Sequence, residues 1–123
     1  MLAGKPLFAF VPTTDMDRAA TFYGDTLGLD VLEHTPYAVV LDAGGTTVRV
    51  TLVQDLQPQP FTILGWLVED IESTARALSD AGIVPLRYGG MEQDGAGVWT
   101  APGGARVLWF NDPDGNTLSL TAV

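Results

Sequence analysis

The chain has 123 residues, a length that fits one compact domain or two small modules sharing a core. Its hydrophobic content of 46% predicts a real core and argues against global disorder. The net charge of −9 argues against nucleic-acid binding, which needs clustered Lys and Arg, and the absence of cysteine excludes disulfides, a thiol nucleophile and thiolate metal ligands.

The first half of the chain predicts a strand, a helix and three further strands. Residues 7–11 form the first strand, which Pro12 ends because it cannot donate a ladder hydrogen bond. Thr14 or Asp15 caps the helix, and Gly28 suits the left-handed position after its last turn. Alternating apolar residues and turn residues then predict strands at 29–34, 37–41 and 47–53.

The second half also predicts a strand, a helix and then several strands. Residues 54–60 contain two prolines and read as a linker before a strand at 61–68. Asp70 caps a helix whose inner face carries Ile71, Thr74, Ala75 and Leu78. Further strands are expected at 83–88, 98–100, 106–111 and 116–122, and the glycine-rich stretch 89–97 is expected to be a mobile loop.

The two halves are copies of each other. Residues 42–51 match residues 112–121 without a gap, with Asp, Gly, Thr and Thr coinciding. Each half also places an apolar strand before an Asp that opens a helix, Asp15 in one and Asp70 in the other. The repeat predicts an α+β protein of two βαβββ modules at 1–53 and 61–123, joined by the linker 54–60 within one compact domain.

This pattern resembles the vicinal oxygen chelate superfamily, which includes glyoxalase I, extradiol dioxygenases, fosfomycin-modifying enzymes and bleomycin-resistance proteins. The most specific segment is Trp-Phe-Asn-Asp-Pro-Asp-Gly-Asn at 109–116 near the C-terminus, supported by Phe22-Tyr23 before Leu27-Gly28. The resemblance implies that each module curls its strands into a half-barrel and that the two half-barrels enclose a central ligand cavity. It also implies a homodimer.

The same resemblance identifies the positions at which the superfamily holds its metal. They are occupied here by Phe8, Arg49, Ile63 and Ser119. Two hydrocarbons, a cation and a hydroxyl are not a ligand set for a divalent cation, so we predict no metal and no other cofactor. His34 is the only histidine, and Asp112 and Asp114 read as turn residues that bond their own backbone.

Strand alternation then predicts the cavity lining. If Phe8 faces the cavity, Phe10 does so as well, because residues two apart on a strand share a face. In the same way, Gly65 and Leu67 face the cavity together with Ile63. The family pattern turns Val107 and Trp109 inward, and the repeat extends this to Tyr37 and Val39. Trp66 lies on the opposite face of its strand from Ile63 and should pack beneath the helices. Alternation does not predict which way Trp99 faces, because Trp99 lies in an irregular stretch. The predicted ligand-binding residues are Phe8, Phe10, Tyr37, Arg49, Ile63, Trp99, Trp109 and Ser119.

Arg49 is the one cation in this lining. A buried charge without a partner is costly, so Arg49 needs either a carboxylate, such as Asp42 or Glu92, or an anionic or carbonyl group on a ligand. A third reading places Arg49 in solvent. The sequence leaves all three open.

Three functions follow from this reading. The first is a metal-free protein of the bleomycin-resistance kind, which binds a small hydrophobic or aromatic molecule, a cationic drug included, for sequestration. The alternative is a lyase or isomerase that uses Arg49 as an electrophile, assisted by Ser119 or Tyr37, or that uses an unrecognised metal site. The third is a module in which the cavity serves packing only. We expect a cytoplasmic protein with a small organic ligand, a second copy of itself as partner and no contact with membranes.

Overall fold

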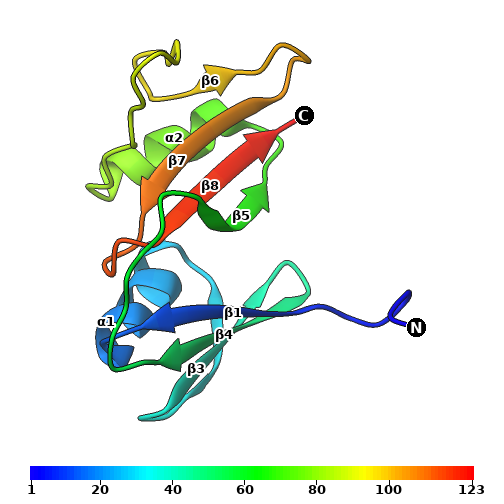
Figure 1. Cartoon of the computed structure of the whole chain (residues 1–123), viewed down its shortest axis with the longest axis vertical. Helices are drawn as coiled ribbons and strands as arrows, with labels where there is room; N and C mark the ends of the chain where they lie inside the picture. Colours follow the sequence, from blue (N-terminus) through cyan, green and yellow to red (C-terminus); the bar gives the residue numbers. More distant parts are fainter. The chain divides into compact units, whose positions relative to one another are not determined.

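A computed structural model describes all residues, 1–123, and contains two four-stranded sheets. The chain divides into two compact units, Met1–Gln57 and Pro58–Val123, with one sheet in each (Figure 1). Each unit is a strand, a helix and three strands, so the protein is α+β and built from two βαβββ modules. No helix is long and apolar enough to cross a membrane.

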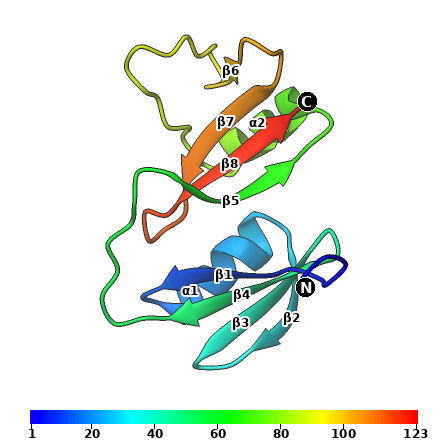
Figure 2. The same cartoon turned by 45° about the vertical axis from the view of Figure 1, so that its right-hand side comes forward.

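The first unit orders its sheet β1-β4-β3-β2 (Figure 2). Strand β1 (Phe8–Thr13) pairs in parallel with β4 (Thr46–Leu52), and the other two pairings are antiparallel, with β3 (Ala38–Ala43) between β4 and β2 (Asp30–His34). The alternation of apolar residues in each strand buries one face of this sheet. That face carries Val11, Val39, Leu41, Val48 and Val50.

The helix of the first unit has two parts. It begins as α1 (Met16–Ala20) and continues as the π-helical turn η1 (Thr21–Thr26). Asp15 is the cap, accepting a hydrogen bond from the Arg18 amide, and Gly28 follows the last turn with φ +80°. The buried side of the helix carries Met16, Ala19, Phe22 and Tyr23.

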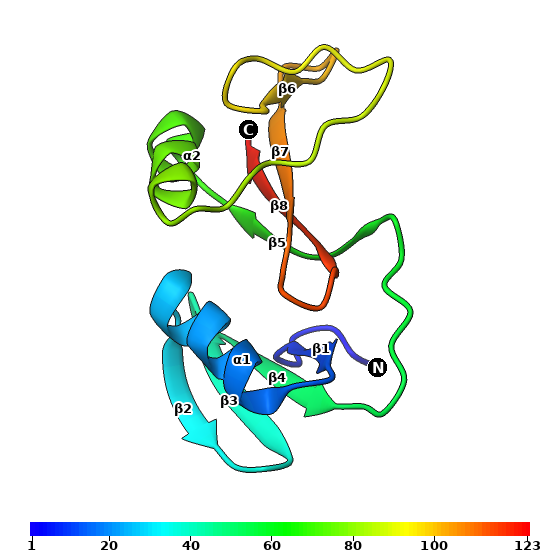
Figure 3. The ribbon, with the colours of Figure 1, turned by 90° about the vertical axis from the view of Figure 1, so that its left-hand side faces the viewer.

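The second unit orders its sheet β5-β8-β7-β6, with α2 on one side of it (Figure 3). Strand β5 (Thr62–Leu67) runs parallel to β8 (Thr117–Ala122), which pairs antiparallel with β7 (Arg106–Asn111). Asp70 caps α2 (Ile71–Asp80), as predicted, by accepting from the Ser73 amide. The core includes Ile71, Ala75, Leu78, Leu108, Phe110, Leu118 and Leu120.

The strand predicted at 83–88 is wrong. This segment is extended but joins the sheet through a single backbone bond, from the Leu86 amide to the Trp109 carbonyl (2.8 Å). Pro85 precedes that amide and has no N–H of its own, so a continuous ladder cannot form. The strand that completes the sheet is the short β6 (Trp99–Thr100), paired with the start of β7.

The predicted facing of Val39 is also wrong. Val39 pairs with Val50 and is fully buried on the side of the sheet that the helix covers, while Ala38, Val40 and Asp42 share the other face. The two hairpins cause this difference. Asp42 pairs with Thr47, but the repeat equivalent of Thr47, Thr117, pairs with Asn111 rather than Asp112. One residue of shift exchanges the faces of a strand.

The turn between β7 and β8 is held by Asp112, which is buried. Its carboxylate accepts hydrogen bonds from the Asp114 amide (3.0 Å), the Asn116 amide (2.9 Å) and the Asn116 side chain (2.9 Å). The prediction that this aspartate bonds its own turn is confirmed.

Candidate functional site

Each sheet has one face covered by its helix and one face that the helix leaves uncovered, which we call the open face. In the first unit the open face carries Phe8 and Phe10 on the edge strand β1. Their rings stack with centroids 4.9 Å apart and planes 14° from parallel. Both are unusually exposed for phenylalanine, at 52% and 61%. Two stacked, exposed rings form an apolar platform of the kind that planar ligands occupy.

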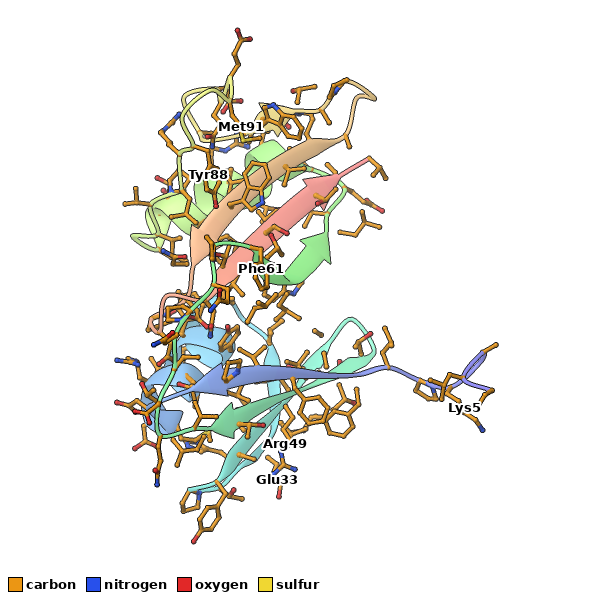
Figure 4. All side chains as sticks on the ribbon, in the orientation of Figure 1. Lys5, Glu33, Arg49, Phe61, Tyr88 and Met91 are labelled. Atoms are coloured by element: carbon orange, nitrogen blue, oxygen red, sulfur yellow. The ribbon has the colours of Figure 1, made fainter.

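Arg49 lies beside this platform. It pairs with Phe10 on one side and with Val40 on the other, and Val40 in turn pairs with Glu33, so the four residues form one row across the open face. Figure 4 labels Arg49 and Glu33. Arg49 is half-buried and forms no hydrogen bond or ion pair. Of the three readings of Arg49, the structure excludes a carboxylate partner within its own unit.

Thr51 follows Arg49 on the same face of β4. Its hydroxyl oxygen is buried and has no hydrogen-bond partner. A buried hydroxyl normally finds a partner because its desolvation is otherwise uncompensated. Arg49 and Thr51 therefore place two polar groups without protein partners on one strand of the open face.

Tyr37 is placed outside the sheet. It lies in the bend before β3 and is 76% exposed. The bend is closed by Thr35, whose hydroxyl accepts from the amides of Tyr37 and Ala38. The structure does not bring Tyr37 into the row of Phe10 and Arg49.

In the second unit, Trp109, Ser119 and Gly65 form the corresponding row of the open face. Ser119 is buried, and a β-carbon built on Gly65 would lie 2.7 Å from its hydroxyl oxygen. The serine side chain thus covers the space that the glycine leaves. Ile63 lies at a bulge between β5 and β8, where Thr62 and Leu64 pair with consecutive residues of β8.

Trp109 is the centre of an aromatic cluster, which consists of Tyr88, Trp99 and Trp109. The Tyr88 ring stands perpendicular to that of Trp109 at 5.4 Å, and the Trp99 ring is tilted against it at 6.0 Å. The structure therefore brings together Trp99 and Trp109, two of the predicted ligand-binding residues.

A hollow of 220 Å³ lies beside the aromatic cluster. Tyr88 and Trp109 line it together with Pro60, Phe61, Thr62, Met91 and Thr117. Figure 4 labels Phe61, Tyr88 and Met91. These three are not among the ligand-binding residues predicted from the sequence. Phe61 and Tyr88 were placed in strands predicted at 61–68 and 83–88, whereas the structure places both outside the strands. The remaining signal was that residues 89–97 contain Met91 as their only large apolar side chain.

The loop at 89–97, which the sequence predicts to be mobile, contains several side-chain hydrogen bonds. The Gln93 side chain accepts from the Tyr88 amide and donates to the carbonyls of Leu86 and Gly97, each at 2.8 Å. Asp94 accepts from the amides of Ala96 and Val98, both at 2.9 Å. These bonds hold the loop, and so support the position of Tyr88 and Met91 beside Trp109.

The residues at the superfamily's metal positions do not fit a divalent cation. Phe8 and Ile63 offer no donor atom, Arg49 is a cation, and the Ser119 hydroxyl lies over Gly65. No group of three or more His, Asp or Glu side chains is arranged to hold a metal. His34 contacts Asp17 at 3.2 Å, but both are exposed and no third ligand joins them.

Comparisons with known proteins identify the superfamily to which the chain belongs. The model of the Glyoxalase/Bleomycin resistance protein/Dioxygenase superfamily matches residues 7–120, and the chain belongs to this superfamily. No curated protein matches the sequence significantly.

Solved structures share the fold at low sequence identity. A superfamily member from Sphaerobacter thermophilus DSM 20745 is 22% identical with a TM-score of 0.75, covering 100% of both chains. The genomically encoded fosfomycin resistance protein FosX from Listeria monocytogenes is 12% identical with a TM-score of 0.78, covering 100% of this chain and 95% of the other. Lactoylglutathione lyase from Agrobacterium tumefaciens is 13% identical with a TM-score of 0.71, covering 97% and 93%.

Proposed function

We propose that this protein binds a small, planar aromatic molecule on its open sheet faces without using a metal. The observation that carries the proposal is the aromatic cluster of Tyr88, Trp99 and Trp109 beside a hollow of 220 Å³. Perpendicular and tilted rings leave aromatic surfaces on which a planar ligand can stack. The chemistry fits a sequestering protein of the bleomycin-resistance kind, acting in the cytoplasm as a homodimer.

The open face of the first unit supports the same ligand chemistry. It offers the stacked rings of Phe8 and Phe10 and, beside them, Arg49 without a protein partner. Binding sites for organic molecules are mostly apolar with a few polar groups that fix orientation. An aromatic molecule with a carbonyl or anionic substituent meets both requirements.

Tryptophan fluorescence tests the proposal. We expect saturable quenching by members of a panel of aromatic antibiotics in protein that contains no stoichiometric metal. Replacing Trp109 by Phe should reduce the quenching amplitude and weaken binding. Trp66→Phe is the matched control, since Trp66 lies on the helix-covered face, where it stacks on Phe110 at 6.4 Å. Stoichiometric metal, or equal quenching in the Trp109 variant, would contradict the proposal.

Arg49 favours a second candidate, a metal-independent lyase or isomerase. A half-buried guanidinium with no carboxylate partner can stabilise negative charge that develops on a substrate carbonyl, and the Thr51 hydroxyl stands next to it on the strand. Turnover of a carbonyl substrate by metal-free protein, lost in Arg49→Gln, separates this candidate from a binding protein.

A further inference from the structure

A hollow that α2 borders lies on the opposite side of the second sheet from the aromatic cluster. It has a volume of 340 Å³ and lies between α2, the segment 83–85 and the loop at 95–96. We call it the helix-side pocket. Its lining is Ala75, Arg76, Leu78, Ser79, Ile83, Pro85, Gly95, Ala96 and Leu108. Its volume falls within the range of about 300 to 1,000 Å³ that is typical of small-molecule sites.

The internal repeat explains why this space is empty. The helices of the two units align from Asp15 and Asp70, which places Tyr23 of the first helix at the position of Leu78 in the second. Both side chains are buried, and leucine is the smaller of the two. Ala75 and Ser79, which line the pocket beside Leu78, are small as well. The second copy therefore lacks the volume that fills the core of the first.

The walls of the pocket are fixed rather than collapsible. The Arg87 guanidinium donates to the carbonyls of Asp94 (2.9 Å) and Gly95 (3.0 Å), which holds the loop at 95–96. Gly97 approaches Pro85 so closely that a β-carbon would lie 2.6 Å from that ring. A hollow with apolar walls and a held rim persists because its neighbours cannot relax into it.

The positive charge of Arg76 determines which charge on a ligand the pocket favours. It is exposed at the rim and forms no hydrogen bond or ion pair, although the chain carries a net charge of −9. The nearby acids are otherwise engaged or do not reach it. Glu72, one turn before, binds Arg106 at 2.5 Å, and the Asp94 carboxylate caps its own loop. Asp80, one turn after, makes no ion pair.

We infer that the helix-side pocket binds a small amphipathic carboxylate. Its aliphatic chain would pack against Ala75, Leu78 and Leu108, and its carboxylate would pair with Arg76, because a guanidinium matches the geometry of a carboxylate. This site is independent of the proposed function, which uses the other face of the sheet.

The test is a titration of the full chain with octanoate, followed by amide shifts in NMR spectra. We expect saturable shifts at Ala75, Ile83 and Ala96, with octanol and octylammonium binding more weakly. Arg76→Gln should weaken octanoate binding roughly three- to tenfold, because the rim position is partly screened by solvent. The binding of octanol should stay unchanged in this variant, and Lys5→Gln is the charge-matched control for both ligands.

A second variant fills the pocket. Ser79→Phe places a ring at the rim without removing a core side chain, and it should abolish octanoate binding while the protein stays folded. Equal binding of octanoate and octylammonium to the unaltered protein, shifts confined to Tyr88 and Trp109, or the absence of saturation would each overturn the inference. The comparison of ligands uses only the natural sequence, so it decides the question even if the Ser79 variant does not fold.

Discussion

The hydroxyl of Ser119 lies over Gly65 of the neighbouring strand, 2.7 Å from where a β-carbon on that glycine would stand. Gly65→Ala should therefore destabilise the protein by about 1 to 3 kcal/mol through overpacking. Urea unfolding measures the loss. Gly103→Ala is the control, since a β-carbon there meets nothing within 4 Å. Ser119→Ala should recover part of the lost stability in the double variant, and failure to do so would show that the clash is not with the hydroxyl.

Asp112 is the second test of stability. Asp112→Ala removes three hydrogen bonds that a buried carboxylate accepts within the turn. We expect a loss of about 2 to 3 kcal/mol in the free energy of unfolding. Asp55→Ala, at an exposed position of the linker segment, should change it by less than about 0.5 kcal/mol. Equal effects of the two substitutions would show that the Asp112 carboxylate does not stabilise the turn.

Gln93 controls the order of the loop that supports Tyr88. Gln93→Ala removes three side-chain bonds, so exchange of the Tyr88 amide hydrogen should become roughly tenfold faster, since opening then costs less. Hydrogen-exchange NMR gives the rate. Glu92→Ala, at the exposed neighbouring position, should leave it unchanged. If the amide exchanges equally fast in all three proteins, the loop is held by other contacts.

Replacing Arg49 by an apolar residue should raise the stability of the protein and weaken ligand binding. Because the half-buried guanidinium has no protein partner, Arg49→Leu should raise the free energy of unfolding by about 0.5 to 1 kcal/mol while weakening the binding of ligands that carry a carbonyl or carboxylate. Arg106→Leu is the contrasting variant, since it removes the ion pair with Glu72 and should lower stability. A loss of stability in the Arg49 variant would indicate a structural role instead.

Local signals in the sequence were enough for most of the fold. The caps at Asp15 and Asp70 and the glycine after the first helix are short-range features, and each appears where its residue type predicts it. Phe8 and Phe10 share one face of β1, as alternation predicted, and their strand pairs with β4 without interruption. Trp66 lies on the helix-covered face of its sheet, as its parity predicted.

The rest depended on interactions between distant segments. Val39 was given the wrong face because an ungapped repeat cannot show that one hairpin pairs its residues one position differently. Tyr88 was predicted to end a strand and Met91 to lie in a loop, and neither prediction places them beside Trp109. Hydrogen bonds with the Gln93 side chain and the bond between Leu86 and Trp109 hold this segment there. The helix-side pocket borders Leu78, which is smaller than its counterpart Tyr23, and such a difference in volume becomes visible only once two packed cores are compared.

The different hairpins of the two units carry a consequence for how such a protein diversifies. A single codon gained or lost in the turn before β4 or β8 leaves these central strands unchanged, but it shifts the pairing of the preceding strand by one residue and so exchanges that strand's two faces. Val40 and Trp109 show such a shift: they occupy equivalent places in their sheets, opposite Arg49 and Ser119, although the ungapped repeat does not match them to each other. An ancestor with two identical halves could thus acquire a new set of ligand-facing side chains along a whole strand through one insertion, without a single substitution.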